Sequence, residues 1–327
     1  MRAPGFWAAR KPTALARLLQ PAGALYGAIT ARRMNRAGER VGAPVVCVGN
    51  FVAGGAGKTP AGLALGRMLI ADGRRVAFLS RGYGGARRAE PLKVDRAIHN
   101  AAMVGDEPLL LAAVAPCWVG PDRVLSANRA IEDGADVLLL DDGLQNPALA
   151  KTLAFAVVDG ETGFGNGLCV PAGPLRAPLA AQAPMVGALI VVGGDDAARR
   201  NIAAALPGRP AFAASLEPDA VAAASLIGRE VVAFAGIARP EKFYATLRRI
   251  GAHVVATRDF PDHHVFSQRE IAALTEEAVR RRAILATTEK DRVRLAPQAA
   301  RAVLTLPVTL RFEEPNRVRE TLRGALR

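Results

Sequence analysis

A glycine-dense stretch between two apolar segments constrains the fold of this chain more than any other feature. The run Val45-Val46-Cys47-Val48 is apolar and mostly β-branched, as a buried strand requires. It is followed by the loop Gly54-Gly55-Ala56-Gly57-Lys58-Thr59, after which apolar residues recur at helical spacing over residues 63–69. The order strand, glycine-rich loop, helix brings backbone N–H groups and a helix N-terminus together, and this arrangement suits the binding of phosphate groups.

The loop departs from the common phosphate-binding pattern at one position. Where G-x-x-x-x-G-K-[ST] has its first glycine this chain has Val52, and glycine-rich turns also close ordinary strand–helix junctions. The remaining residues together still favour nucleotide binding. We predict that Lys58 reaches the β- and γ-phosphates and that the Thr59 hydroxyl binds Mg²⁺. The other expected contacts of the nucleotide come from Gly54, Gly55, Ala56 and Gly57.

Strands and helices alternate beyond the loop, which predicts an α/β fold with a doubly wound, mostly parallel sheet of the P-loop NTPase type. We expect strands at residues 75–79, 117–119, 135–140, 153–158, 188–192 and 211–216, and helices at 106–115 and 127–133. Near residue 225 the pattern restarts, with strands at 230–236, 253–257, 283–287 and 303–312, a helix at 240–250, and a capping box opening a helix at Ser267. These patterns predict a P-loop domain at 41–225 and a second, smaller α/β domain at 226–327.

Net charge and cysteine content indicate which classes of binding partner and which cellular compartment to expect. The formal net charge is +13, so anionic partners must be considered. Basic residues are not interleaved with aromatic ones and no nucleic-acid-binding module is recognisable, so we expect no nucleic-acid partner. No obligate protein partner is evident either. Cys47, Cys117 and Cys169 are widely spaced and fit neither a disulfide framework nor a zinc site, which indicates a reducing compartment.

Residues 1–40 form a basic, amphipathic segment. Against Glu39 alone they hold eight cations: Arg2, Arg10, Lys11, Arg17, Arg32, Arg33, Arg36 and Arg40. Apolar residues recur at helical spacing, at Leu15, Leu18, Leu19, Ala22, Tyr26 and Ile29. The uncharged run over 18–31 contains Pro21 and is too short to cross a bilayer, which takes about 20 apolar residues. Docking on an anionic membrane surface, packing of the stripe on the protein core, and a cleaved signal peptide are the alternatives.

Carboxylates at the ends of expected elements can complete a phosphate site. Asp141 ends an apolar run, where it can hold Mg²⁺ opposite Thr59, and Asp142 is a second candidate unless it only caps the turn. Asp106 opens an expected helix, where it can accept a proton from an alcohol or simply cap the helix. His263 can orient such a carboxylate or be an ordinary histidine of a surface loop. Spacing alone favours the structural role for both Asp106 and His263.

Several blocks taken together resemble one known family. They begin at Val48-Gly49-Asn50 and the glycine-rich loop and continue, in order, through Ser80-Arg81-Gly82-Tyr83-Gly84, Gly105-Asp106-Glu107-Pro108, Asp141-Asp142-Gly143-Leu144-Gln145-Asn146, Pro171-Ala172-Gly173-Pro174-Leu175-Arg176, Phe260-Pro261-Asp262-His263-His264 and Thr288-Glu289-Lys290-Asp291. On these blocks the sequence closely resembles the tetraacyldisaccharide 4'-kinases, the lipid A 4'-kinases of Gram-negative bacteria. That family also lacks the first glycine of the loop pattern, so Val52 agrees with the resemblance.

The resemblance implies ATP-dependent phosphorylation of the 4'-hydroxyl of a tetraacylated glucosamine disaccharide 1-phosphate, giving lipid IVA. It places the protein at the cytoplasmic face of the bacterial inner membrane, as a peripheral or monotopic protein docked through residues 1–40. By the same likeness, Lys58 and Thr59 hold the phosphates and Mg²⁺, and Asp106 is the base for the sugar hydroxyl. His263 is its expected partner, with His264 as the other candidate, and the smaller domain is expected to close over the nucleotide.

Three arginines are candidates for the substrate's 1-phosphate, because the guanidinium fork suits phosphate: Arg81, Arg123 and Arg176. Each could instead form an ordinary structural ion pair. The chain departs from the family at Ala56, where a hydroxyl residue is frequent, and at Ala177, where an acid is frequent. We expect modest effects on rate from both departures.

Two other functions are compatible with the loop. A membrane-associated regulatory ATPase of the deviant-Walker type shares Gly-Gly-x-Gly-Lys-Thr, but it places a lysine just before the paired glycines, where this chain has Ala53. A nucleotide-gated scaffold would have no acceptor chemistry at all. Movement of the γ-phosphate to a lipid, rather than only to water, separates the kinase from both.

Overall fold

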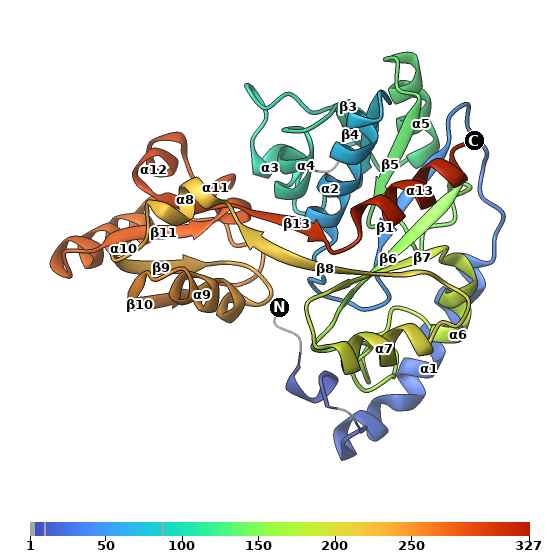
Figure 1. Ribbon diagram of the computed structural model, residues 1–327, viewed down its shortest axis with the longest axis horizontal. Coiled ribbons are helices and arrows are strands. Elements are labelled where there is room, and N and C mark those ends of the chain that lie inside the picture. The colour runs from blue at the N-terminus through green and yellow to red at the C-terminus, as the bar shows by residue number, and fades with distance from the viewer. Residues whose placement is uncertain (1–3, 10, 87) are drawn as a thin grey trace.

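Two sheets of unequal size organise the chain (Figure 1). The computed structural model describes residues 4–9, 11–86 and 88–327. Two of the cations counted in the N-terminal segment, Arg2 and Arg10, therefore lie outside the described residues. A nine-stranded sheet carries the glycine-rich loop, and a four-stranded sheet forms a second unit beside it.

The larger sheet has the strand order β13-β8-β7-β6-β1-β5-β2-β4-β3. Its strands are β1 (Val45–Gly49), β2 (Val76–Ser80), β3 (Leu92–Lys93), β4 (Cys117–Val119), β5 (Val137–Asp141), β6 (Leu153–Asp159), β7 (Ala188–Val192), β8 (Ala211–Pro218) and β13 (Val308–Phe312). Pairing is parallel from β8 to β4 and antiparallel only where β13 and β3 join at the two edges. The doubly wound, mostly parallel sheet predicted from the alternation is thus confirmed.

Helices cover both faces of this sheet, which is why β1, β5 and β7 are buried along their whole lengths. One face packs against α2 (Lys58–Ala71), α3 (Ala101–Val104), α4 (Asp106–Leu111) and α13 (Pro315–Ala325). The other packs against α5 (Arg123–Glu132), α6 (Leu179–Gln182), η2 (Ala183–Met185) and α7 (Asp196–Ala204). Successive residues of β1 alternate between the two cores, since Val46 and Val48 face one while Val45 and Cys47 face the other.

The smaller sheet is entirely parallel, in the order β10-β9-β11-β12. Its strands are β9 (Glu230–Ala235), β10 (His253–Asp259), β11 (Ile284–Thr288) and β12 (Leu304–Leu306), with α8 (Ala220–Ala224) and α9 (Pro240–Arg249) on one face and α10 (Gln268–Arg280) and α12 (Pro297–Ala302) on the other. The short helix α11 (Glu289–Arg292) follows β11. The capping box expected at Ser267 is present, with Glu270 as its reciprocal partner.

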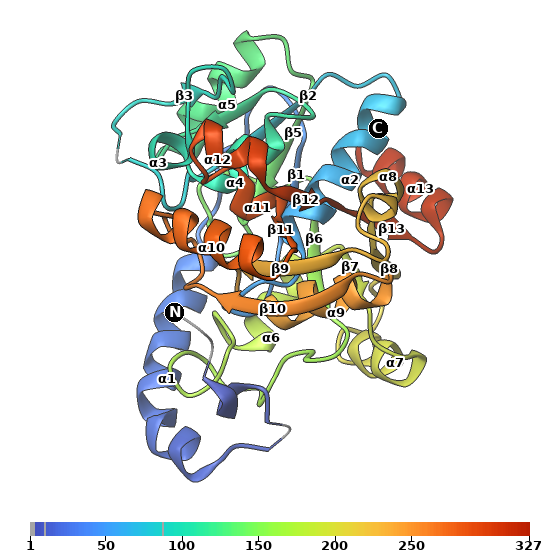
Figure 2. The ribbon, with the colours of Figure 1, turned by 90° about the vertical axis from the view of Figure 1, so that its left-hand side faces the viewer.

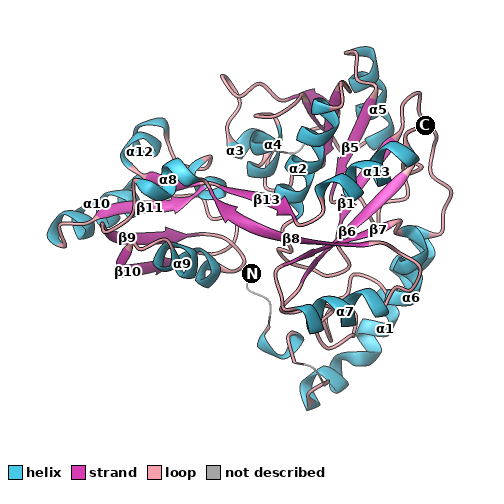
Figure 3. Cartoon of the chain, in the orientation of Figure 1, coloured by secondary structure: helices cyan, strands magenta, loops and turns pink. Residues whose placement is uncertain are grey.

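The expected end of the smaller unit needs a correction. The strand expected over 303–312 is two strands, because β12 pairs with β11 whereas β13 pairs antiparallel with β8 of the larger sheet. Pro307 separates them, and it cannot donate a hydrogen bond to continue β12. Leu310 then packs into the larger core, and α13 follows on that sheet. Residues 308–327 therefore belong to the larger unit, and β8 and β13 connect the two (Figure 3).

The N-terminal segment forms η1 (Gly5–Trp7) and the helix α1 (Ala14–Met34), which continues through Pro21 and lies at the margin of the molecule (Figure 2). The side of α1 that faces the protein is made of the small residues Ala16, Gly23, Gly27 and Thr30, with Met34 at its end. A Cβ added at Gly27 would lie 2.7 Å from Cys169 Sγ. The expected apolar stripe faces outward instead, with Leu18 77% and Ile29 62% exposed. Packing on the core therefore does not account for the stripe. Within the described residues, no helix has the length and apolarity needed to cross a bilayer.

Candidate active site

The glycine-rich loop leads from β1 into α2 through two glycines with positive φ. Gly54 has φ 124° and Gly57, the N-cap of α2, has φ 86°, a region that side chains with a Cβ rarely occupy. Lys58, the first residue of α2, folds back over the loop. Its Nζ lies 3.4 Å from the Gly54 carbonyl oxygen and 3.8 Å from Asp142 Oδ2. The predicted phosphate-binding residues thus share one tight turn at the carboxyl end of a central strand.

Acidic residues gather beside Lys58. Asp141 ends β5, the strand paired with β1, and it is almost fully buried. Burial, followed by the negative charges of Glu107 and Asp142, raises the pKa of Asp141 to about 8. Asp142 follows with φ 49°, and its Oδ2 accepts a 2.9 Å hydrogen bond from Arg176. Its Oδ1 is buried without a hydrogen-bond partner among the described residues.

Asp106 lies at the first residue of α4 and its carboxylate is only 3% exposed. Oδ1 accepts a 2.9 Å hydrogen bond from the Glu107 backbone N–H. His263, from the smaller unit, places Nδ1 3.1 Å from Oδ2 and 3.2 Å from Oδ1. His263 has φ 60°, and its backbone N–H donates to the Gly236 carbonyl at the end of β9. The fold therefore joins the two residues that the resemblance paired.

Two further cations from the smaller unit face the same carboxylate. Arg294 donates from Nε and Nη2 to Asp106 Oδ2, the Nε contact being 2.9 Å. Lys290 Nζ lies 3.1 Å from Glu107 Oε1 and 3.9 Å from Asp106 Oδ2. Burial alone would raise the pKa of Asp106. The His263 hydrogen bond and the charges of Lys290 and Arg294 outweigh it and hold that pKa well below its usual range.

The neighbouring histidine points elsewhere. His264 Nε2 lies 2.9 Å from Glu270 Oε1, and its ring stacks on Phe260 with centroids 4.8 Å apart. His263 instead meets the ring of Tyr83 edge to face, with centroids 5.1 Å apart. Of the two candidate histidines, the structure brings only His263 to Asp106.

The three candidate arginines occupy different environments. Arg81 is exposed at the end of β2. Arg123 is 4% exposed and donates to the carbonyls of Ser80 and Gly120. Arg176 donates to Asp142 and, from Nε, to the Val52 carbonyl at 3.1 Å. Arg123 and Arg176 thus already hold the strand ends and the loop together, whereas Arg81 is open to solvent.

A second set of ion pairs joins the two units beside the loop. Arg239 and Lys242 of the smaller unit lie 2.6 and 2.7 Å from Asp159 Oδ2, and both also reach Glu161. A Cβ added at Gly55 would lie 3.6 Å from the Ala238 side chain. The loop that precedes α9 therefore lies directly against the glycine-rich loop.

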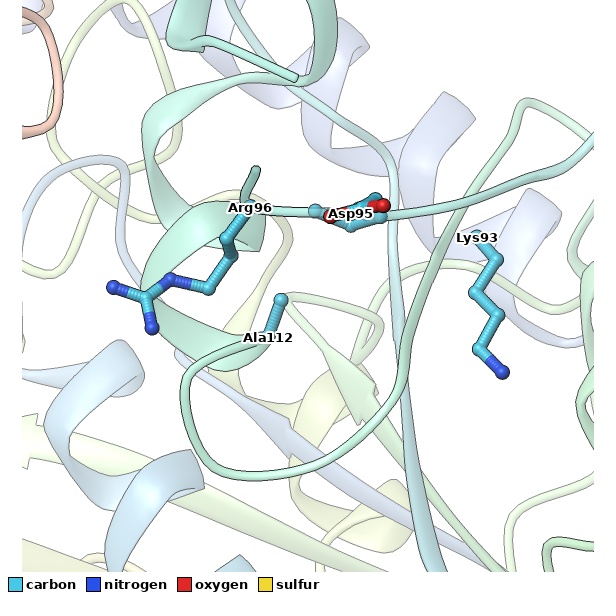
Figure 4. A pocket seen from close by; sticks show the side chains of 5 residues that line it. Lys93, Asp95, Arg96 and Ala112 are labelled. Atoms are coloured by element: carbon cyan, nitrogen blue, oxygen red, sulfur yellow. The ribbon is translucent and has the colours of Figure 1, made fainter. Parts of the chain in front are cut away.

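A concave region of about 380 Å³ lies near the other end of α4 (Figure 4). It is lined by Lys93, Val94, Asp95, Arg96 and Ala112, and the side chains of Lys93 and Arg96 extend in opposite directions. This lining includes none of the predicted site residues. Among the described residues, no group of three or more histidine, cysteine or acidic side chains is arranged to hold a metal ion.

Fold and site together define a class of protein. A glycine-rich loop and buried acids at the carboxyl ends of parallel strands characterise the α/β folds that bind nucleotides. The family follows from comparison of the sequence: residues 15–327 match the model described as tetraacyldisaccharide-1-P 4'-kinase. The chain therefore belongs to the tetraacyldisaccharide-1-phosphate 4'-kinase family, as its sequence blocks indicated.

Individual relatives agree. A tetraacyldisaccharide 4'-kinase of Methylobacterium radiotolerans is 56% identical over 329 residues, covering 100% of this chain and 99% of the relative. One from a Methylobacterium species is 57% identical over 312 residues, covering 95% and 93%. Among solved structures, the "apo" form of LpxK from Aquifex aeolicus in complex with ATP matches with a TM-score of 0.75 at 25% identity, covering 96% of this chain and all of that one.

Sequence reasoning missed several residues of the site. Glu107 and Lys290 lie within blocks that carry the family resemblance, but spacing gave them no role. Arg294 lies four residues beyond Lys290, outside every block, and the sequence contains no signal that joins it to Asp106. The packing of α11 against α4, with Arg294 in the turn that follows α11, brings these residues together.

Proposed function

We propose that this protein transfers the γ-phosphoryl group of ATP to the 4'-hydroxyl of a tetraacylated glucosamine disaccharide 1-phosphate, forming lipid IVA. The observation that carries the proposal is the pairing of Asp106 with His263 across the two units of a chain that belongs to this kinase family. ATP as donor is supported by the structural relative solved in complex with ATP.

The glycine-rich loop is the proposed nucleotide site. Lys58 leaves Gly54 and Asp142 to meet the β- and γ-phosphates, and the amides of Gly54, Gly55, Ala56 and Gly57 surround them. Phosphoryl transfer depends mainly on positioning and on neutralising charge at the transferred group, which a lysine and loop amides supply. The smaller unit closes over the nucleotide, in keeping with the close approach of Ala238 to Gly55, where an added Cβ would lie 3.6 Å from the Ala238 side chain.

The residues beside the loop suit Mg²⁺. Thr59 and Asp141 offer oxygen ligands, and the unpaired Oδ1 of Asp142 adds a third. Burial and the negative charges of Glu107 and Asp142 raise the pKa of Asp141, and a bound cation would oppose that shift. When bound, Mg²⁺ would neutralise charge on the phosphates. Thr59 and Asp141 would hold it there, with Asp142 beside them.

Asp106 is the proposed acceptor of the hydroxyl proton. Its low pKa keeps it ionised, and His263 shares one N–H between both carboxylate oxygens. His263 can therefore yield one oxygen to an incoming hydroxyl and keep the other. As the sugar oxygen attacks the γ-phosphorus, its proton passes to Asp106 and ADP leaves.

The lipid substrate is proposed to approach from the membrane. The exposed stripe of α1, with Leu18 and Ile29, would enter the apolar boundary of the cytoplasmic leaflet of the inner membrane, and the exposed Arg17, Arg32 and Arg33 would meet anionic headgroups. Arg81, which is open to solvent, is the proposed contact of the 1-phosphate. Arg123 and Arg176 would hold the strand ends and the loop of that region in place through the hydrogen bonds described above.

One experiment tests the function directly. The purified protein is incubated with γ-labelled ATP, Mg²⁺ and the acylated disaccharide 1-phosphate in detergent micelles, and the lipid is chromatographed. Label in a new lipid that is lost to a phosphomonoesterase supports the proposal. Label released only as inorganic phosphate would identify an ATPase and overturn it.

A further inference from the structure

Arg294 is a buried cation that no motif explains. Its side chain is 3% exposed, and it lies in the turn just after α11 of the smaller unit. Its guanidinium nevertheless reaches across to Asp106 of the larger unit, 188 residues away in sequence. A buried guanidinium is costly unless its donors are matched, so its partners define its role.

One side of the guanidinium is fixed within the smaller unit. Nη1 donates to the Gly236 carbonyl at 2.8 Å and to Asp291 Oδ1 at 3.0 Å. The same Gly236 carbonyl accepts the backbone N–H of His263, and the Gly236 N–H donates to Asp291 Oδ1 at 2.9 Å. Arg294 and His263 are thus held on one shared carbonyl, so they approach Asp106 as a single unit.

The other side of the guanidinium donates hydrogen bonds to one oxygen of Asp106 and not to the other. Nε and Nη2 both converge on Oδ2, and neither donates to Oδ1. Oδ1 keeps the Glu107 backbone N–H and a share of the His263 N–H. Each carboxylate oxygen can accept about two hydrogen bonds, so Oδ2 is saturated while Oδ1 retains capacity.

We propose that Arg294 is a positioning residue of the phosphotransfer site: by saturating Oδ2 of Asp106 it fixes the carboxylate and leaves Oδ1 to accept the proton of the sugar hydroxyl. This inference rests on the proposed function. Because Arg294 is anchored on Gly236 and Asp291 of the smaller unit whereas Asp106 belongs to the larger one, the carboxylate has this orientation only while the two units are in contact.

The test compares three variants for phosphate transfer to the acylated disaccharide 1-phosphate. Arg294→Met removes both the positive charge and the planar set of guanidinium N–H donors. Arg294→Lys keeps a positive charge without that set of donors. Arg292→Met is the matched control, since Arg292 is two residues away, carries the same charge and donates to Thr305. For each, kcat is measured against pH, together with the KM for ATP and the melting temperature.

For Arg294→Met we expect kcat to fall on the order of 10- to 100-fold, as misplacement of a reacting group does. The KM for ATP should stay close to that of the wild type. The acidic limb of the kcat profile should move to higher pH, because loss of a cation makes Asp106 easier to protonate. Other charged groups near Asp106, namely Glu107, Asp262, His263, Lys290 and Asp291, are common to the variant and the control.

The kcat of Arg294→Lys should be lower than that of the wild type, and the acidic limb of its pH profile should move little. An Arg294→Met protein with the kcat and pH profile of Arg292→Met would overturn the inference. If Arg294→Met does not fold, Arg294→Lys decides: reduced kcat at wild-type melting temperature supports positioning, and wild-type kcat refutes it. A wild-type protein that transfers no phosphate to the lipid would instead refute the proposed function.

Discussion

Nδ1 of His263 lies 3.1 Å from Oδ2 of Asp106, although 157 residues separate them in sequence. Asp106 begins α4 on the larger sheet, and His263 lies in a turn after β10 of the smaller one. Neither unit contains the pair alone. Contact between the units is therefore a condition for the proposed proton transfer, and the pair can be tested by substitution.

Asp106→Asn should depress kcat by about 10²- to 10⁴-fold, the usual contribution of a general base, while the KM for ATP changes little. The amide cannot take the proton, but it retains the size of the carboxylate. Asp122→Asn is a matched control, because Asp122 caps α5 with hydrogen bonds to Val124 and Leu125 away from Asp106. If Asp106 only stabilised its helix, Asp106→Asn would keep kcat as Asp122→Asn does, because Asn serves at a helix N-terminus about as well as Asp.

The pH dependence of kcat separates the two members of the pair. Asp106 has a depressed pKa, so it is ionised above that value and protonated only as the pH falls through it. With Asp106 as base, kcat should stay level down to about pH 5. The pH profile of His263→Asn corrects for ionisation of ATP itself, and an acidic limb at higher pH that is present only in the wild type would reverse the roles.

Lys58→Ala should abolish transfer and leave the fold intact. Among the residues that the structure describes, its Nζ contacts one loop carbonyl and, at 3.8 Å, Asp142, which keeps its closer partner Arg176. Lys93→Ala is the control, because Lys93 pairs with Asp133 at the edge of the sheet. Transfer of radioactive phosphate to the lipid measures activity, and thermal melting measures the stability of the fold. Substantial activity in Lys58→Ala would remove the loop from the mechanism.

The outward face of α1 can be tested apart from its packing face. Leu18→Glu combined with Ile29→Glu should lower binding to anionic vesicles by at least about tenfold, since each side chain contributes roughly 1.5–3 kcal/mol when buried in an apolar phase. Both residues are largely exposed, so the melting temperature should not change. Gly27→Leu should do the opposite, since its Cβ would collide with Cys169 Sγ. Co-sedimentation unaffected by the double substitution would contradict membrane docking through this stripe.

Arg81 and Arg123 should respond differently to substitution by methionine. Arg123→Met leaves the buried carbonyls of Ser80 and Gly120 short of a donor, at a cost of about 1–3 kcal/mol in stability. Arg81→Met should leave stability unchanged and raise the KM for the lipid. Thermal melts, and kinetics corrected for the folded fraction, test the two expectations. An unchanged KM for the lipid in Arg81→Met would exclude Arg81 from the substrate site.

Much of the fold could be predicted from local patterns. The apolar runs of β1, β5 and β7 are uninterrupted because both faces of these strands are covered, and this signal is visible in sequence. The capping box at Ser267 likewise depends only on neighbouring residues. The membership of β13 could not be predicted, because an edge strand has the same local pattern in either sheet and Pro307 alone marks the change.

The residues of the candidate site fall into the same two groups: those that local patterns predict and those that depend on tertiary packing. Lys58, Thr59 and Asp141 lie in local motifs, so their proximity follows from parallel strands that end at one edge of a sheet. Asp106 and His263 were paired only through the family resemblance, since spacing favoured ordinary roles for each. Arg294 depends on how α11 packs against α4, and no pattern in the sequence encodes that contact.

The pairing of Pro218 with Val308 has an evolutionary consequence. The chain leaves the large sheet at the end of β8 and re-enters it at the adjacent start of β13, so residues 219–307 amount to an insertion at the tip of a hairpin. A short turn in their place would leave the register of those two strands unchanged. An ancestor with the bare sheet could thus have gained the unit that carries His263, Lys290 and Arg294 in one genetic event.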